Sequence, residues 1–155
     1  MKRNRLPENR RQALNSYVKL MRATNHLTGR IHRHLLDDNL TQSQFGVLEA
    51  LYHLGPLSPS DLGQKILKSN ANLTTVLDSL EKKRLVVRDR SASDRRRISV
   101  QLTESGEQLI ARIFPRHAEI IAREFSVLSP EEHLQLGRLL KKLGSVTRED
   151  DTARS

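Results

Sequence analysis

The sequence contains no cysteine and no tryptophan, and aromatic residues make up only 3% of its 155 positions. The absence of cysteine excludes a disulfide scaffold and a thiol redox sensor. No apolar run approaches the roughly 18 residues that suggest a transmembrane helix. The first eleven residues are basic and lack the apolar stretch of a signal peptide. We therefore expect a soluble, cytoplasmic protein with the length of a single domain and no membrane partner.

The sequence has an excess of positive charge. Its 27 lysine and arginine residues outnumber 18 aspartate and glutamate residues, which gives a net charge of +9 at pH 7. Residues 1–36 hold nine of the cations and one anion, whereas residues 104–155 are nearly neutral. A strongly basic protein often binds a polyanion, most commonly nucleic acid. A solvated basic surface is the alternative explanation of the charge alone.

Apolar residues at steps of three and four predict six helices. We expect them to begin near residues 8, 41, 58, 69, 103 and 129. Thr41 and Gln44 have the spacing of a capping box, and Ser58, Thr103 and Ser129 are further N-cap candidates. The first helix is expected to stop at residues 37–39, and the fifth contains Pro115, where a kink is expected.

The hydrophobic period changes to two after the fourth helix. Residues 85–90 and 98–102 predict two strands, and residues 91–97 between them form a polar loop with three consecutive arginines. Such a short hairpin is not stable alone, so it is expected to pack on the preceding helices. A short helix, a second helix with a polar outer face and a two-stranded wing together predict a winged helix-turn-helix.

The outer face of the fourth helix is small and polar, which suits insertion into the major groove of DNA. The candidate contacts on this helix are Ser69, Asn70, Asn72, Thr74 and Thr75. The first two lie at the helix N-terminus, where backbone N–H groups favour a phosphate. An ordinary solvated helix face is the alternative interpretation.

The arginines of the wing suit the narrow, electronegative minor groove. The candidate wing contacts are Asp94, Arg95, Arg96 and Arg97, with the aspartate positioned to hold a neighbouring arginine.

Residues 94–106, DRRRISVQLTESG, resemble the signature of the MarR family of winged-helix transcription regulators. The matching positions are Asp94, Arg96, Leu102, Thr103 and Gly106. Residues 77–88 are similar to the end of that family's recognition helix and its first wing strand, although Arg84 replaces the glycine common there. If that position is left-handed, the non-glycine residue costs on the order of 1 kcal/mol.

The resemblance extends over essentially the whole chain and implies a homodimer held by the first, fifth and sixth helices. The expected fold is mainly α with a small β-wing: a winged helix-turn-helix DNA-binding lobe plus a helical dimerisation region. We expect four segments: a dimerisation helix (1–39), the DNA-binding region (40–103), C-terminal dimerisation helices (104–146) and a frayed tail (147–155).

The resulting hypothesis is a sequence-specific regulator of transcription, a repressor that binds double-stranded DNA at a near-palindromic operator and is released by a small ligand. Two segments, residues 40–58 and 68–83, look most similar to the family branch associated with quinone and phenolic stress. Candidate pocket residues for such an aromatic effector are His26, Phe45, Tyr52, Phe114 and His117. The alternatives are a winged-helix protein-interaction module and a non-specific nucleoid-binding protein.

An enzyme, a cofactor and a metal site are not expected. The sequence offers no nucleophile triad that can be argued and no glycine-rich phosphate loop after a strand. His32 and His34 are two residues apart on a predicted helix and should point in different directions. His117 has Ile113 and Ile121 as its helical neighbours, so no second histidine joins it as a ligand.

Overall fold

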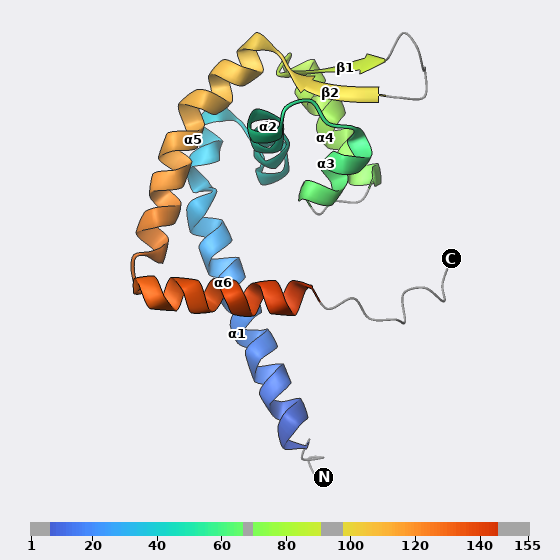
Figure 1. Ribbon diagram of the computed structural model, residues 1–155. Coiled ribbons are helices and arrows are strands. Elements are labelled where there is room, and N and C mark those ends of the chain that lie inside the picture. Colours follow the sequence, from blue (N-terminus) through green and yellow to red (C-terminus); the bar gives the residue numbers. More distant parts are fainter. Residues whose placement is uncertain (1–6, 67–69, 91–97, 146–155) are drawn as a thin grey trace, which may run out of the picture. The chain divides into compact units, whose positions relative to one another are not determined.

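The computed structural model describes residues 7–66, 70–90 and 98–145, and the helices and strands follow the predicted order (Figure 1). Its elements are α1 (Glu8–Ile31), the 3₁₀ helix η1 (Arg33–Asp38), α2 (Gln42–Leu54), α3 (Pro59–Ile66), α4 (Asn70–Lys82), β1 (Val86–Arg90), β2 (Ile98–Leu102), α5 (Glu104–Phe125) and α6 (Pro130–Gly144). The predicted mainly α fold with a small β-wing is confirmed. The chain forms two compact units, Met1–Ile120 and Ile121–Ser155, which are described separately.

The core of the first unit lies where α2, α3, α4 and the strands contact one another (Figure 1). The fourth helix contributes the apolar stripe that its spacing predicts, because Leu73, Leu77 and Leu80 are fully buried. Phe45 and Leu48 of α2 and Leu62 of α3 are buried in the same cluster. This packing fixes the opposite face of α4 toward solvent.

The first helix ends earlier than its apolar spacing predicts. It stops at Ile31, and the following residues form the tighter η1 up to Asp38. The His32 ring contacts the last turn through Nδ1, 3.0 Å from the Thr28 carbonyl oxygen. Both His34 and Leu35 of this 3₁₀ helix are buried.

The predicted helix starts are confirmed at the capping residues. The Thr41 hydroxyl accepts from the Gln44 backbone N–H at 3.1 Å, and the Gln44 side chain accepts from the Thr41 N–H at 3.0 Å. The same reciprocal capping box is present between Ser129 and Glu132 at the start of α6. Gly55, which ends α2, has the positive φ of 76° that glycine accommodates without a steric penalty. The fifth helix runs unbroken through Pro115.

The two strands form an antiparallel pair in which Arg88 is opposite Val100. The outer edge of β2 is also paired, because Leu57 exchanges two backbone hydrogen bonds with Val100, at 3.0 and 2.8 Å. The wing therefore rests on the segment between α2 and α3 as well as on α4. This is how a hairpin too short to be stable alone is held in place.

Arg84, in the turn between α4 and β1, adopts the left-handed conformation with φ 57°. The departure from glycine therefore carries the strain expected from the sequence, about 1 kcal/mol. The tight turn is retained because the Arg84 N–H donates to the Glu81 carbonyl at 2.8 Å and the Leu85 N–H to the Leu80 carbonyl at 3.0 Å.

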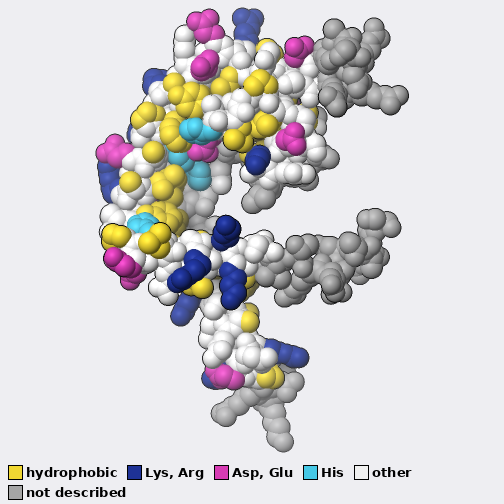
Figure 2. All heavy atoms as spheres, in the orientation of Figure 1, with side chains coloured by type: hydrophobic (Ala, Val, Ile, Leu, Met, Phe, Trp, Pro, Cys, Tyr) yellow, Lys and Arg dark blue, Asp and Glu magenta, His cyan; other side chains and the backbone are white. Residues whose placement is uncertain are grey.

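Several helices carry large apolar side chains on exposed faces. They are Leu14, Tyr17 and Met21 on α1 and Leu134, Leu139, Leu140 and Leu143 on α6. On the face shown in Figure 2, hydrophobic side chains also gather over α5. Among the described residues, no helix combines the length and apolar character needed to cross a bilayer.

Candidate nucleic-acid interface

The exposed face of α4 carries the side chains that the sequence assigns to base contacts. Asn72, Thr74 and Thr75 are all exposed, while Leu73 and Leu77 of the same helix are buried. Asn70 is the first residue of α4, and Ser69 lies outside the described residues. A rigid helix backed by the core and presenting short polar side chains has the geometry that the major groove admits.

The four candidate wing contacts, residues 94–97, lie outside the described residues. The structure does describe the strands on both sides of them. The β1–β2 pairing continues to Arg90 opposite Ile98. Both ends of the segment from residue 91 to residue 97 are therefore anchored to the same unit as α4.

Arg88 of β1 makes a dense set of contacts with the last two turns of α4. Its Nε and Nη2 atoms donate to Glu81 Oε2 at 2.9 and 2.5 Å, and its backbone N–H donates to Glu81 Oε1 at 3.0 Å. Its Nη2 atom also pairs with Asp78. The Arg88 guanidinium holds the pKa of the Glu81 carboxyl below its usual range, mainly through the side-chain hydrogen bond.

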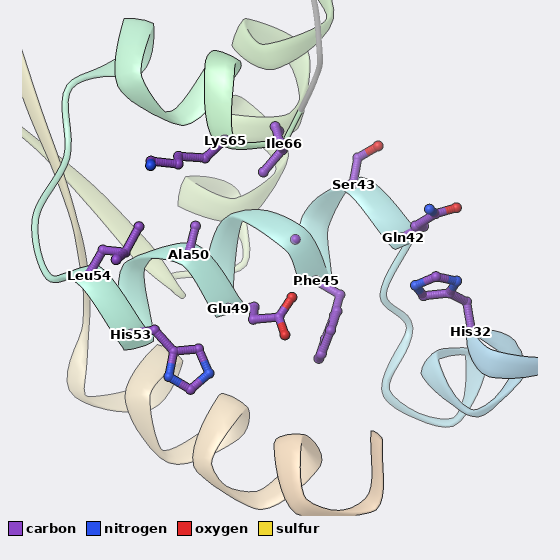
Figure 3. A pocket seen from close by; sticks show the side chains of 11 residues that line it. His32, Gln42, Ser43, Phe45, Glu49, Ala50, His53, Leu54, Lys65 and Ile66 are labelled. Carbon is purple, nitrogen blue, oxygen red and sulfur yellow. The ribbon is translucent and has the colours of Figure 1, made fainter. Parts of the chain in front are cut away.

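A cavity of about 430 Å³ lies beside α2, within the size range of small-molecule sites. Figure 3 shows Phe45, Glu49 and His53 extending from one side of α2, and Lys65 and Ile66 reaching from α3 on its other side. His32, from the end of α1, stands at one end of the cavity. The remaining lining residues are Gln42, Ser43, Gly46, Ala50 and Leu54.

The predicted pocket residues are only partly brought together by the structure. Phe45 lines the cavity, and its ring centroid lies 4.3 Å from that of His117. Tyr52 and Phe114 form a second ring contact with centroids 6.4 Å apart. His26 is exposed on α1. The cavity residues that the sequence analysis missed include Glu49 and His53, whose spacing of four and eight residues from Phe45 was the available signal.

Two buried histidines meet next to Phe45. His34 Nε2 lies 3.0 Å from His117 Nδ1, and the His32 ring centroid is 5.5 Å from that of His117. The prediction that His32 and His34 diverge was wrong, because the change to the 3₁₀ helix brings both rings to the same residue. No group of three or more potential ligand side chains converges as a metal site within the described parts of the chain.

Burial keeps this histidine pair neutral. Loss of solvation, together with the neighbouring His34 and His32, lowers the pKa of His117 to about 4. Burial also lowers the pKa of His34, with Arg116 adding to the effect. His34 Nδ1 is buried without a hydrogen-bond partner. Because a buried unpaired N–H is rarer than an unpaired acceptor, the hydrogen of His34 belongs on Nε2, where it donates to His117.

Known proteins are similar to this chain in both sequence and fold. Residues 40–98 match the MarR family. Over 133 residues, 86% of this chain and 92% of the relative, the sequence is 38% identical to the HTH-type transcriptional regulator MhqR of Bacillus subtilis (strain 168). The chain belongs to the MarR family. It is a DNA-binding regulator of transcription and not an enzyme, as the sequence predicted.

Solved structures of two DNA-binding proteins share this fold. The MepR protein of S. aureus, solved as a complex with DNA, aligns with a TM-score of 0.74 at 28% identity, covering 84% of this chain and 97% of MepR. The BpsR protein of Bordetella bronchiseptica aligns with a TM-score of 0.75 at 28% identity, covering 83% of this chain and 91% of BpsR. BpsR was solved in work on the regulation of its DNA binding by 6-hydroxynicotinic acid.

Proposed function

We propose that this MarR-family chain is a cytoplasmic, homodimeric repressor that binds a near-palindromic operator and is released by a small aromatic ligand. The observation that carries the proposal is the exposed polar face of α4, with Asn72, Thr74 and Thr75 held outward by buried leucines. Ser69 and Asn70 anchor a phosphate at the start of the helix, and residues 94–97 grip the adjoining minor groove. A dimer places two recognition helices one DNA turn apart, roughly 34–36 Å.

The exposed apolar side chains support the dimer. Four large apolar residues of α6 are between 43% and 77% exposed, and α1 adds Leu14, Tyr17 and Met21 on its own surface. Apolar patches of this kind on a charged protein mark interaction sites. A second copy of the chain is the proposed occupant, which assigns residues 1–39 and 104–146 to dimerisation and residues 40–103 to DNA.

Sequence-specific binding is tested by selecting bound sites from random duplex DNA. The protein is expected to enrich a near-palindromic site. Its affinity should fall steeply with salt, because the logarithm of the binding constant falls against the logarithm of the salt concentration with a slope of about −0.9 per phosphate contact. A steep slope without enrichment indicates non-specific nucleoid binding instead. Absence of DNA binding at low salt points to the protein-interaction alternative.

Replacement of Thr75 by alanine is expected to relax the base preference at one position of each half-site. The lost contact is worth about 1–3 kcal/mol of discrimination. The measurement is a repeat of the selection with T75A, together with titration of the selected duplex. Ser105→Ala is the matched control, because Ser105 is an exposed hydroxyl on α5 away from the α4 face. An unchanged preference in T75A would reject the role of Thr75.

The cavity beside α2 supports the ligand part of the proposal. The small residues Gly46 and Ala50 line part of the cavity and leave room for a ring, and Phe45 supplies an aromatic side chain. Glu49, His53 and Lys65 offer polar groups that can orient a ring substituent (Figure 3). In BpsR, DNA binding is regulated by a hydroxylated aromatic acid, so phenols, quinones and 6-hydroxynicotinic acid form the panel to be tested.

Gly46→Leu is expected to abolish the response to any active member of this panel while leaving DNA affinity within about twofold, because the added side chain occupies the part of the cavity next to Phe45 that a bound ring would need. The Gly46 position tolerates a Cβ, whose nearest contact is Ile66 Cγ2 at 3.5 Å. Release of operator DNA by the panel is measured for both proteins by fluorescence anisotropy. Equal release from the variant would place the effector elsewhere.

A further inference from the structure

Arg88 of β1 is held by Glu81 of α4, the helix that is proposed to enter the major groove. Both oxygens of Glu81 are occupied: Oε1 by the Arg88 backbone N–H at 3.0 Å, and Oε2 by its guanidinium at 2.5 and 2.9 Å. One carboxylate thus holds the main chain and the side chain of the same strand residue. Charge-assisted, two-pronged contacts of this kind fix orientation as well as adding stability.

Asp78, which also pairs with Arg88, lies on the face of α4 that is proposed to meet DNA. It follows Thr74 by four residues and Thr75 by three, so all three side chains lie on the same face of the helix. The Asp78 side chain is 58% exposed, and its carboxylate pairs with Arg88. A carboxylate left unpaired on this face would repel the phosphates of a bound duplex.

We infer that Arg88 is a positioning residue for operator binding, which ties the first wing strand to the recognition helix and neutralises Asp78 beside the base-reading side chains. The inference rests on the proposed DNA-binding function and adds a residue that does not itself contact DNA. The Arg88 side chain is only 28% exposed, and its guanidinium is already engaged by two carboxylates. The Glu81–Arg88 contact therefore fixes β1, the strand that precedes residues 91–97, against the end of α4.

The competing role for a basic residue at this position is direct contact with a phosphate, and the two roles predict opposite results for Glu81→Gln. If Arg88 positions the wing, E81Q weakens binding to the selected duplex, because the main-chain and side-chain contacts both lose their charged acceptor. If Arg88 binds phosphate, E81Q frees the guanidinium and strengthens binding to every duplex. Arg88→Lys also separates the two roles, because lysine keeps the positive charge but lacks the planar guanidinium that makes paired hydrogen bonds to a carboxylate.

The experiment titrates the full-length protein and its variants with two duplexes: the site recovered by selection and a scrambled version of it. E81Q and R88K are each expected to weaken binding to the selected duplex about tenfold, with the scrambled duplex changed by less than about threefold. The double variant should bind no more weakly than the weaker single variant, because both changes break one contact. The fold is monitored by circular dichroism, and titrations are run well below each melting midpoint.

Arg112→Gln is the matched control, since it removes an exposed cation whose partner is Asp38 of η1. It should leave the ratio of the two affinities unchanged. Tighter binding by E81Q, wild-type binding by R88K, or equal weakening on both duplexes would overturn the inference. Failure of the wild-type protein to distinguish the duplexes would instead refute the proposed function, before any variant is compared.

Discussion

Replacement of Gly106 by alanine is expected to lower the free energy of unfolding by about 3 kcal/mol or more. An added Cβ would lie 2.0 Å from the Leu85 carbonyl oxygen and 2.9 Å from its carbon. These Leu85 atoms belong to the backbone between α4 and β1, so no side-chain rotation can relieve the overlap. The start of α5 would have to move away from the wing.

That movement would also break the hydrogen bonds around Thr103. Its hydroxyl donates to the Arg84 carbonyl at 2.7 Å and accepts from the Gly106 N–H at 3.0 Å, while its own N–H donates to the Leu85 carbonyl at 3.1 Å. Urea unfolding of G106A measures the effect. Gly137→Ala is the control, because a Cβ there meets nothing within 4 Å and alanine favours the helix. A G106A midpoint equal to that of the wild type would contradict the close approach.

Acidification is expected to destabilise the protein between about pH 6.5 and pH 4 through the His34–His117 pair. The pKa of His117 is about 4 in the folded protein, against an ordinary value of 6.5 in the unfolded chain. As the pH falls below 6.5, the unfolded chain binds protons that the folded chain excludes, and the free energy of unfolding falls. For this histidine the loss amounts to about 3 kcal/mol and is complete near pH 4. His34 acts in the same direction.

The measurement is the free energy of unfolding in urea at several pH values. His117→Gln should be less stable than the wild type at pH 7, because the buried ring that accepts from His34 and contacts Phe45 is lost, yet its stability should fall less steeply between pH 6.5 and pH 4. The exposed His26, changed to glutamine, serves as the control and should leave the slope unaltered. Parallel curves for wild type and His117→Gln would show that the pair is not held neutral by the fold.

Much of this structure was predictable because the local signals are strong. Thr41 with Gln44 and Ser129 with Glu132 form the capping boxes that their spacing predicts. The alternating residues of β2 and the stripe at Leu73, Leu77 and Leu80 likewise have the burial that their periods indicate. The role of Gly106 explains in physical terms why glycine is part of the sequence signature.

The remaining features depend on contacts between distant parts of the chain. His34 and His117 are 83 residues apart and meet only because η1 replaces the last turns of the predicted first helix. The cavity beside α2 depends on where α3 places Lys65 and Ile66, which no local pattern specifies. The sequence places Arg88 only within the first predicted strand, and its position next to Glu81 and Asp78 is what shows that its charge is already engaged.

The contact between Glu81 and the main chain of Arg88 also bears on self-association. An isolated two-stranded ribbon presents open backbone groups on its outer sides, which invite strands from other molecules. At this pair of residues backbone groups on both sides are engaged, since the Arg88 N–H donates to Glu81 and Leu57 pairs with Val100. These positions of the hairpin are therefore protected against intermolecular β-sheet growth and aggregation.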